Sequence, residues 1–288
     1  MPHFHFSFAI LHSPFSISNS LENLKYPMTH IHPDAKIAEG VQIEPFVTIK
    51  GDVVIEEGCW LGSNVVIHDG ARIGKNTRIF PGAVISSIPQ DLKFAGEITT
   101  CEIGENCIIR EFDTINRGTK ESHTTKVGNN VLIMAYAHVA HDCVLGNNVI
   151  LANAVNLAGH VIIDDFAIVG GMSAIHQFVR IGKHSILQGG SLVGKDVPPF
   201  CKGAHFPLRY SGVNALGLRR RAFDAQTITD IQDIYRLLFA SGKNVSQALQ
   251  SIEEEITPSP IRDEILEFVK SSNRGIMKGY KPGSDDEA

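Results

Sequence analysis

The sequence has no strong excess of charge of either sign and few cysteines. Its 288 residues include 26 Lys and Arg against 31 Asp and Glu, a formal net charge of −5. This balance excludes an overall electrostatic attraction to nucleic acid or to an anionic membrane surface. The five cysteines form no C-x-x-C motif, which argues against a zinc ribbon and a thioredoxin-type redox site. An odd cysteine count in a chain long enough to fold without disulfides predicts a reducing, cytoplasmic location.

The sequence also lacks a convincing transmembrane span. Residues 143–163 carry no Asp, Glu, Lys or Arg, but they include four Asn and one His. Hydrocarbon penalises such polar side chains heavily. We therefore expect no integral membrane segment.

Residues 1–27 are rich in Phe, His and Ser and contain little charge. They lack the basic n-region and the small-residue cleavage site of a secretory signal. We expect an extension that is disordered or reflects a mis-called start, because Met28 directly precedes the first repeat. For the rest of the chain, 43% hydrophobic and 20% charged residues exclude global disorder.

An aliphatic residue recurs at every sixth position from Ile31 to Val193. Of the 28 positions in this series, 25 are Ile, Leu or Val. The three exceptions are Asp91, Glu97 and Glu121, which fall in two expected loops at about 86–102 and 116–126. A small side chain usually lies two positions earlier. Period six matches neither an α-helix nor a flat strand, so it predicts stacked coils of short parallel strands.

This pattern resembles the left-handed parallel β-helix of the hexapeptide-repeat acyltransferases, with three hexads in each coil. The handedness comes from that resemblance, since parallel crossovers are usually right-handed. We therefore expect a mainly β protein, with a left-handed β-helix over residues 28–200. Residues 201–288 are expected to form an α-helical C-terminal domain with a frayed tail. Helical spacing of apolar residues places its helices at about 222–240, 245–256 and 261–269.

An 18-residue coil brings several histidines together on neighbouring coils. His141, Gly159 and Gln177 share one column, and His160 and His176 lie one residue from it. His138 belongs to the coil of His141, and Asp142 follows His141 directly. The cluster suits either acid–base catalysis or a zinc site, and the spacing alone leaves both open.

Longer motifs resemble the UDP-N-acetylglucosamine O-acyltransferases of lipid A biosynthesis. The similarity covers residues 28 to about 275 and is carried by segments 89–97, 137–143, 157–160, 170–178 and 212–221. The resemblance implies transfer of a 3-hydroxyacyl chain from acyl-carrier protein to the sugar 3-hydroxyl, without a metal or other cofactor. It also implies a homotrimer with sites between subunits.

The resemblance assigns roles to individual residues. His141 matches the general base, Asp142 its orienting carboxylate, and the Gly159 N–H an oxyanion donor. Gly189 matches a position that limits acyl length, and a glycine there leaves room for a long chain of about 14 carbons or more. Residues matching positions around the sugar and acyl groups are Asp91, Lys93, His138, His160, His176 and Gln177. Residues matching the nucleotide and carrier-facing region are Asn214, Arg220 and Arg221.

Two departures from the family pattern affect the acceptor site. Asn116 stands where family members often have His, so this position can donate a hydrogen bond but cannot carry charge. The following loop, which contains His123, is also built differently, and its role is open. The departure at Asn116 concerns the contact with the sugar or the acyl chain and not the base. Separately, the sequence leaves open whether the sugar acceptor is the N-acetyl compound or a 3-amino analogue.

Three alternatives carry different expectations. The paralogous N-acyltransferase of the same pathway has a separate N-terminal uridine-binding domain, for which the roughly 30 residues before the repeat leave no room. A gamma-type carbonic anhydrase would require bound zinc. A non-catalytic hexapeptide assembly protein would show no turnover that depends on His141.

Overall fold

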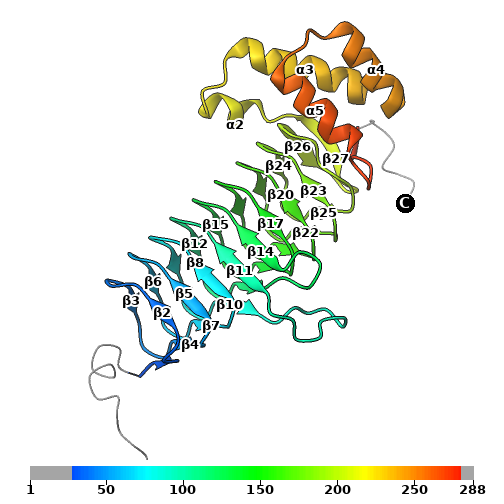
Figure 1. Ribbon diagram of the computed structural model, residues 1–288. Helices are drawn as coiled ribbons and strands as arrows, with labels where there is room; N and C mark the ends of the chain where they lie inside the picture. The colour runs from blue at the N-terminus through cyan, green and yellow to red at the C-terminus, as the bar shows by residue number, and fades with distance from the viewer. Residues whose placement is uncertain (1–27, 280–288) are drawn as a thin grey trace, which may run out of the picture.

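The computed structural model describes residues 28–279, and the expectation for residues 1–27 lies outside the described residues. The chain folds as a left-handed parallel β-helix followed by an α-helical domain, as expected for the fold class (Figure 1). Each coil contributes one short strand to each of three sheets, and the strands pair with those of the next coil. The three sheets therefore enclose a long interior.

The sheets are named A, B and C in the order in which the chain meets them. Sheet A contains β1 (His30–Ile31), β4 (Thr48–Ile49), β7 (Val66–Ile67), β10 (Val84–Ser87), β13 (Thr114–Asn116), β16 (His138–Val139), β19 (Asn156–Leu157), β22 (Ala174–Ile175) and β25 (Leu192–Val193). Sheet B contains β2 (Lys36–Ile37), β5 (Val53–Ile55), β8 (Ala71–Ile73), β11 (Thr100–Ile103), β14 (Thr124–Val127), β17 (Val144–Leu145), β20 (Ile162–Ile163) and β23 (Arg180–Ile181). Sheet C contains β3 (Gln42–Ile43), β6 (Trp60–Leu61), β9 (Arg78–Ile79), β12 (Ile108–Ile109), β15 (Leu132–Ile133), β18 (Ile150–Leu151), β21 (Ile168–Val169) and β24 (Ile186–Leu187), and β26 (Cys201–Ala204), β27 (Arg209–Val213) and β28 (Lys278–Gly279) extend it.

The six-residue series forms the interior of the coils. Its side chains point inward and stack on their equivalents one coil away, as Ile67 does on Ile85 in the register of sheet A. From Ile49 onward the aliphatic members are almost completely buried. Burial of apolar surface stabilises proteins by roughly 25 cal/mol per Å². This continuous aliphatic column is thus the core of the fold.

Two insertions lengthen the coils without disturbing the period of six. Ile85 pairs with Ile115, thirty residues later rather than eighteen, and Ile103 pairs with Val127, twenty-four residues later. The extra residues number twelve and six. Because both are multiples of six, the series of aliphatic positions continues through the sequence in one phase. The ladder continues to Ser87 and resumes at Thr100, so the first loop is narrower than the expected 86–102.

The second loop is likewise narrower than the expected 116–126, because β13 ends at Asn116 and β14 begins at Thr124. The first loop, residues 88–99, projects sideways from the coils (Figure 1).

The C-terminal domain contains α2 (Ala215–Arg220), α3 (Ala225–Ala240), α4 (Val245–Glu255) and α5 (Pro260–Lys270). Asp224 caps α3 by accepting a hydrogen bond from the Thr227 N–H at 2.8 Å. The apolar face read from the sequence is buried: Ile228, Ile231, Ile234, Tyr235 and Leu238. The short helix α2 and the antiparallel pair β26–β27 carry no periodic signal and were not expected.

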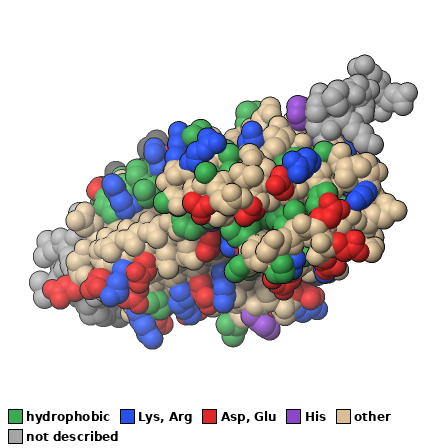
Figure 2. All heavy atoms as spheres, turned by 90° about the horizontal axis from the view of Figure 1, so that it is seen from above, with side chains coloured by type: hydrophobic (Ala, Val, Ile, Leu, Met, Phe, Trp, Pro, Cys, Tyr) green, Lys and Arg blue, Asp and Glu red, His purple; other side chains and the backbone are tan. Residues whose placement is uncertain are grey.

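No helix among residues 28–279 has the length and apolar character needed to span a bilayer. Viewed from the side on which Figure 1 places the helical domain, basic and acidic side chains are interspersed (Figure 2). This face therefore shows no large area of one charge.

A single carboxyl group interrupts the otherwise apolar interior. Asp113 is fully buried in the column of small residues that includes Ala83 and Ala137. Its Oδ1 accepts a hydrogen bond from the Ala137 N–H at 2.8 Å, while its Oδ2 has no partner among the described residues. Burial raises the pKa of Asp113 to about 8. The side chain is therefore held in its neutral form in the folded protein near pH 7.

We predict that Asp113→Asn removes a pH-dependent loss of stability. The unfolded carboxyl ionises near pH 4 and the folded one near pH 8. Stability should therefore fall as pH rises through this window, since the unfolded state releases the proton first. In urea unfolding at pH 5 and pH 8, the neutral variant should gain stability over the wild type, and more at pH 8. The exposed control Glu39→Gln should change neither value. Identical pH dependence in wild type and Asp113→Asn would contradict the prediction.

Candidate active site

The predicted catalytic pair lies where the chain passes from sheet A to sheet B, which we call the A–B corner. His141 and Asp142 come shortly after β16 and are only 8% and 3% exposed. Asp142 has a positive φ of 60°, as do His160 and Phe178, with values of 60° and 66°, on the next two coils. The Asp142 N–H donates to Oγ1 of Thr125 at 2.8 Å. This hydrogen bond holds the turn that presents the pair.

Asp142 fixes the orientation of the His141 imidazole. Nδ1 of His141 lies 2.8 Å from Oδ2 of Asp142. Since an ionised carboxylate only accepts hydrogen bonds, Nδ1 carries the proton and Nε2 keeps its lone pair. This tautomer is the one that a general base requires.

Several hydrogen bonds keep Asp142 ionised. Thr119 donates to it twice, from its N–H to Oδ1 at 2.9 Å and from its hydroxyl to Oδ2 at 2.7 Å. The Ser122 hydroxyl also donates to Oδ1. Burial raises the pKa of Asp142, but the hydrogen bonds from Ser122, His141 and Thr119 outweigh burial and lower this pKa to about 2. Asp142 is thus a carboxylate at neutral pH.

His160 extends the site along the A–B corner. Its Nε2 lies 3.5 Å from Oδ2 of Asp142, and its ring meets that of His141 edge to face with centroids 5.3 Å apart. On its other side it stacks on Phe178 at 4.7 Å. The spacing of one coil therefore brings the two imidazoles together, as the 18-residue interval predicted.

Gly159 leaves the space that the His141 ring occupies. A Cβ at position 159 would lie 2.5 Å from Cε1 and 2.7 Å from Nε2 of His141. No real side chain tolerates such contacts, so the base packs directly on the glycine backbone. Among residues 28–279, the Gly159 N–H has no hydrogen-bond acceptor of its own. It is therefore available to a ligand.

The remaining predicted histidines lie at the same end of sheet A. His138, on β16, is half-buried and its Nδ1 is 2.7 Å from Oγ1 of Thr114. Burial, with a smaller contribution from His141, lowers the pKa of His138. His176 is exposed and its Nδ1 donates to the Gln177 carbonyl at 3.1 Å. These side chains add polar groups along sheet A, on the coil of the dyad and two coils beyond it.

Four predicted residues lie at other corners of the same chain. Asn214 is buried, caps α2 through the Gly217 N–H at 3.3 Å and donates to the His184 carbonyl at 2.9 Å. Arg221 lies over the Phe166 ring, 5.2 Å from its centroid, while Arg220 is exposed. Gly189 is exposed at the corner between sheets C and A. One chain alone therefore does not bring these residues to His141.

The loop of residues 88–99 leaves the A–B corner two coils before the dyad. Within it, Oδ1 of Asp91 accepts a hydrogen bond from the Lys93 N–H at 3.0 Å, and the Lys93 side chain is exposed. Asn116 lies beneath the loop and is 1% exposed. Its Nδ2 donates to Ser87 Oγ at 2.7 Å and to the Ile88 carbonyl at 3.2 Å. Asn116 thus secures the base of this loop.

Sequence reasoning missed the residues that surround Asp142. Thr119 and Ser122 belong to the second insertion, and Thr125 follows it. A usable signal was present: this coil contains six extra residues, and the insertion is placed one coil before the His–Asp pair. His123 contributes through its backbone, with its N–H donating to the Thr119 carbonyl at 2.8 Å.

His141, Asp142 and His160 also form a potential metal-binding group, because their ligand atoms lie within 4.8 Å of one another. The Asp142 carboxylate, however, already accepts four hydrogen bonds, from Thr119 twice, Ser122 and His141. Four is about the number of acceptor positions that a carboxylate offers. The acceptor positions of Asp142 are therefore occupied by the hydrogen bonds that orient the dyad, and these three residues do not fit a zinc ion.

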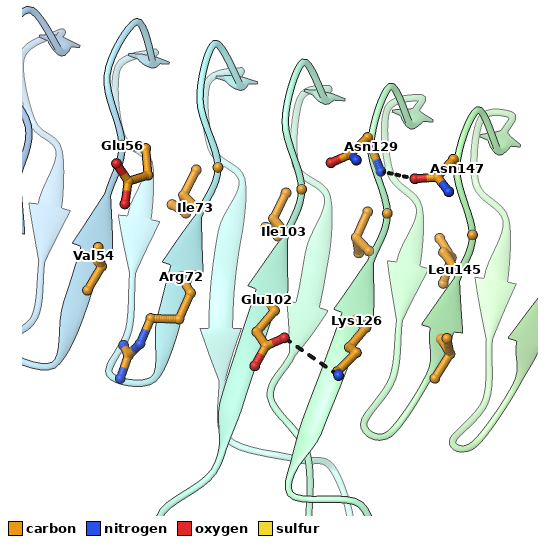
Figure 3. A pocket seen from close by; sticks show the side chains of 16 residues that line it. Val54, Glu56, Arg72, Ile73, Glu102, Ile103, Lys126, Asn129, Leu145 and Asn147 are labelled. Carbon is orange, nitrogen blue, oxygen red and sulfur yellow. Dashed lines mark hydrogen bonds and ion pairs between the residues drawn. The ribbon is translucent and has the colours of Figure 1, made fainter.

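A shallow groove of about 570 Å³ lies elsewhere, along sheet B and the turns that follow it (Figure 3). Its rim includes Arg72, Glu102 and Lys126, the last two paired at 3.8 Å. Glycines form its floor because successive coils approach closely there; a Cβ on Gly74 would lie 2.7 Å from the Gly104 carbonyl carbon. None of the predicted site residues lines this groove.

Two family profiles match the chain. The one described as UDP N-acetylglucosamine O-acyltransferase, domain 2, matches residues 196–277. The bacterial transferase hexapeptide profile matches residues 52–87 and 124–159.

Two relatives and two solved structures match over nearly their whole length. The chain is 47% identical over 253 residues to an acyl-[acyl-carrier-protein]–UDP-N-acetylglucosamine O-acyltransferase of Alkalilimnicola ehrlichii, covering 88% of this chain and 98% of that one. The enzyme of the same name from Verminephrobacter eiseniae is 42% identical over 262 residues, with 87% and 100% coverage. The solved UDP-N-acetylglucosamine acyltransferase of Bacteroides fragilis superposes with a TM-score of 0.86 at 48% identity, covering 88% and 99% of the two chains. That of Francisella novicida gives 0.85 at 37% identity, with 90% and 94% coverage.

We predict that Gly159→Ala displaces the His141 ring. The added methyl group overlaps the imidazole, and overpacking of this kind costs about 1–3 kcal/mol of unfolding free energy. Urea unfolding measures the loss, and a crystal structure of the variant locates the ring. Gly194→Ala is the matched control, because a Cβ there meets no atom within 4 Å. An unmoved ring with wild-type stability would refute the packing argument.

Proposed function

The chain belongs to the UDP-N-acetylglucosamine O-acyltransferase family, and from this premise we propose that His141 is the general base of its reaction. The enzyme transfers a 3-hydroxyacyl chain from acyl-carrier protein to the 3-hydroxyl of UDP-N-acetylglucosamine, the first step of lipid A biosynthesis. The observation that carries the assignment of the base is the 2.8 Å bond between His141 Nδ1 and an Asp142 carboxylate held in its ionised form.

In the proposed mechanism, Nε2 of His141 takes the proton of the sugar 3-hydroxyl. The oxygen attacks the thioester carbonyl, and the Gly159 N–H donates to the oxyanion that forms. Such a donor typically contributes a factor of roughly 10²–10³ in rate. Asp142 stabilises the imidazolium meanwhile. The intermediate then expels the carrier thiolate, which receives the proton from His141, so the base is regenerated and no metal or cofactor takes part.

We assign substrate contacts to the groups around the dyad. His138, His160, His176 and Gln177 lie on the coil of His141 and on the next two coils, and we assign them to contacts with the sugar and the acyl chain. We assign Asp91 and Lys93 to the same region, supplied by the loop of residues 88–99.

The other corners of the chain carry the nucleotide and carrier contacts in this proposal. Asn214 and Arg221 are assigned to the nucleotide side, although their side chains also stabilise α2 and the adjoining coil. Arg220 is exposed and makes no ion pair among the described residues. It is thus free to meet an acidic carrier protein. Gly189 leaves its corner open for a long acyl chain.

A homotrimer would bring these corners together, since one subunit separates them. The three sheets differ in what they present to the outside. Sheet B carries mostly charged outward side chains. On sheet C, five successive strands present only aliphatic ones: Ile108, Leu132, Ile150, Ile168 and Ile186. We propose that sheet C packs against neighbouring subunits.

All five cysteines are free and buried, which suits the cytoplasm. Of the rival functions, a gamma-type carbonic anhydrase requires a zinc site, and the Asp142 carboxylate does not offer one because its acceptor positions are occupied. A non-catalytic scaffold would not need the hydrogen-bonded His141–Asp142 pair.

We predict that His141→Ala slows product formation by orders of magnitude. Wild-type protein incubated with UDP-N-acetylglucosamine and 3-hydroxyacyl carrier proteins of several lengths should yield a 3-O-acylated sugar nucleotide, best with long chains. Loss of the base should lower the rate by roughly 10²–10⁴-fold. Mass spectrometry identifies the product and the preferred length. A 3-amino sugar acceptor is the second arm. A variant as active as wild type would overturn the role of His141, and no product with either acceptor would overturn the proposed reaction.

We predict that Ile150→Asp on sheet C dissociates the trimer, because a charge would be buried at the subunit contact. Sedimentation should give three times the chain mass of 31.4 kDa for wild type and a lower mass for the variant. Ile162→Asp makes the same change on sheet B and should leave the mass unaltered. If only Ile162→Asp dissociates the assembly, the subunit contact lies on sheet B, and its assignment to sheet C is wrong.

A further inference from the structure

The second insertion adds six residues within the loop 117–123, and among the described residues it is the only departure from an 18-residue coil next to the dyad. Thr114 on β13 pairs with His138 on β16 twenty-four residues later, whereas His138 pairs with Asn156 after eighteen. The six extra residues are therefore not needed to build the coil. They lie at the A–B corner, directly beside Asp142, where they can act on the dyad.

The insertion provides most of the donors that reach the Asp142 carboxylate. Three of its four hydrogen bonds come from Thr119 and Ser122, and only the fourth comes from His141. The Asp142 side chain is completely shielded from solvent. Within the described residues these groups thus replace the water that would otherwise solvate the anion.

The geometry of the insertion suits this task. The His123 N–H donates to the Thr119 carbonyl at 2.8 Å, which closes the loop on itself. The Thr119 hydroxyl also accepts from the Glu121 N–H at 3.3 Å, so its own proton points to Asp142. Ser122 could instead donate to the Thr124 carbonyl at 3.0 Å. The carboxylate is the stronger acceptor, because charge-assisted hydrogen bonds are about twice as strong as neutral ones.

We propose that Thr119 and Ser122 are positioning residues that set the protonation behaviour of the His141–Asp142 dyad. Their hydroxyls hold Asp142 in its anionic form and draw part of its negative charge away from His141. This inference rests on the proposed function of the dyad. It assigns the insertion a specific role in the reaction, namely to keep His141 neutral and ready to accept a proton over a wider pH range.

The direction of the effect follows from electrostatics. When a hydroxyl donor is lost, more of the Asp142 charge faces the imidazole and favours the imidazolium. The dyad then becomes protonated at higher pH, and the acid limb of kcat/KM moves upward. The titratable groups that face Asp142 are His141, His160 and the Cys143 thiol, and His138 faces His141. Lys120, Glu121 and His123 of the insertion are exposed.

The experiment compares pH profiles of kcat/KM for the full chain and its variants, using UDP-N-acetylglucosamine and a long-chain 3-hydroxyacyl carrier protein. Ser122→Ala and Thr119→Val each remove one hydroxyl, and Thr119→Val keeps the backbone N–H. Ser122→Thr and Thr119→Ser retain the hydroxyl and should restore the wild-type profile. Thr124→Val is the control, because its hydroxyl lies at the start of β14, directly after the insertion, but donates to the Thr125 carbonyl.

We expect each hydroxyl loss to move the acid limb up by about 0.5–1 pH unit, which lowers kcat/KM roughly 3- to 10-fold below the limb. KM for both substrates should stay unchanged, and the alkaline plateau should change less. An acid limb that stays in place in both variants, or that moves equally in Thr124→Val, would overturn the inference. Because Ser122 is exposed, its truncation leaves the core intact.

The His141→Ala variant distinguishes a failure of the proposed function from a failure of the positioning role of Thr119 and Ser122. If the wild type shows no acyl transfer, the proposed function fails. If the wild type is active and His141→Ala is not, but the profiles of Ser122→Ala and Thr119→Val coincide with that of the wild type, only the positioning role fails.

Discussion

Stacking of one coil on the next through parallel hydrogen bonds and a continuous aliphatic interior is the constraint on which the molecule depends. Each strand is only two to five residues long, far too short to be stable alone. A side chain such as Ile133 gains its burial from Ile109 before it and Leu151 after it. The period of six follows directly, because a residue that slips out of phase would point outward and leave a cavity between two coils.

Uniform coils cannot by themselves create a reactive site, since every corner repeats the same backbone. The chemistry gathers where the chain departs from uniformity. At the A–B corner, two insertions bring extra polar groups to one edge, and Gly159 makes room for an imidazole that any other residue would displace. A rigid column on one side and an added loop on the other thus hold His141 between them.

The sequence allowed much of this to be predicted, and the failures have physical causes. The interior column and the proximity of His141 to His160 follow from intervals of six and eighteen, which hold throughout the later coils. The same interval fails across the insertions, so it does not place Thr119 and Ser122 beside Asp142; only the extra hexad one coil earlier points to that corner. The strands β26 and β27 have no hexad spacing, and their pairing depends on long-range contacts. Asn214 was assigned by motif, and no motif reveals that its side chain also caps α2.

The place of the two insertions has a consequence for how such a chain can change in length. Both loops leave the β-helix at a corner and rejoin it at the same corner, so the strands on either side keep their pairing partners one coil away. The side chains that face the interior are therefore the same ones that would face it without the loops. A β-helix of this kind can acquire residues at its corners while its core stays unchanged, and the loop beside Asp142 is one such addition.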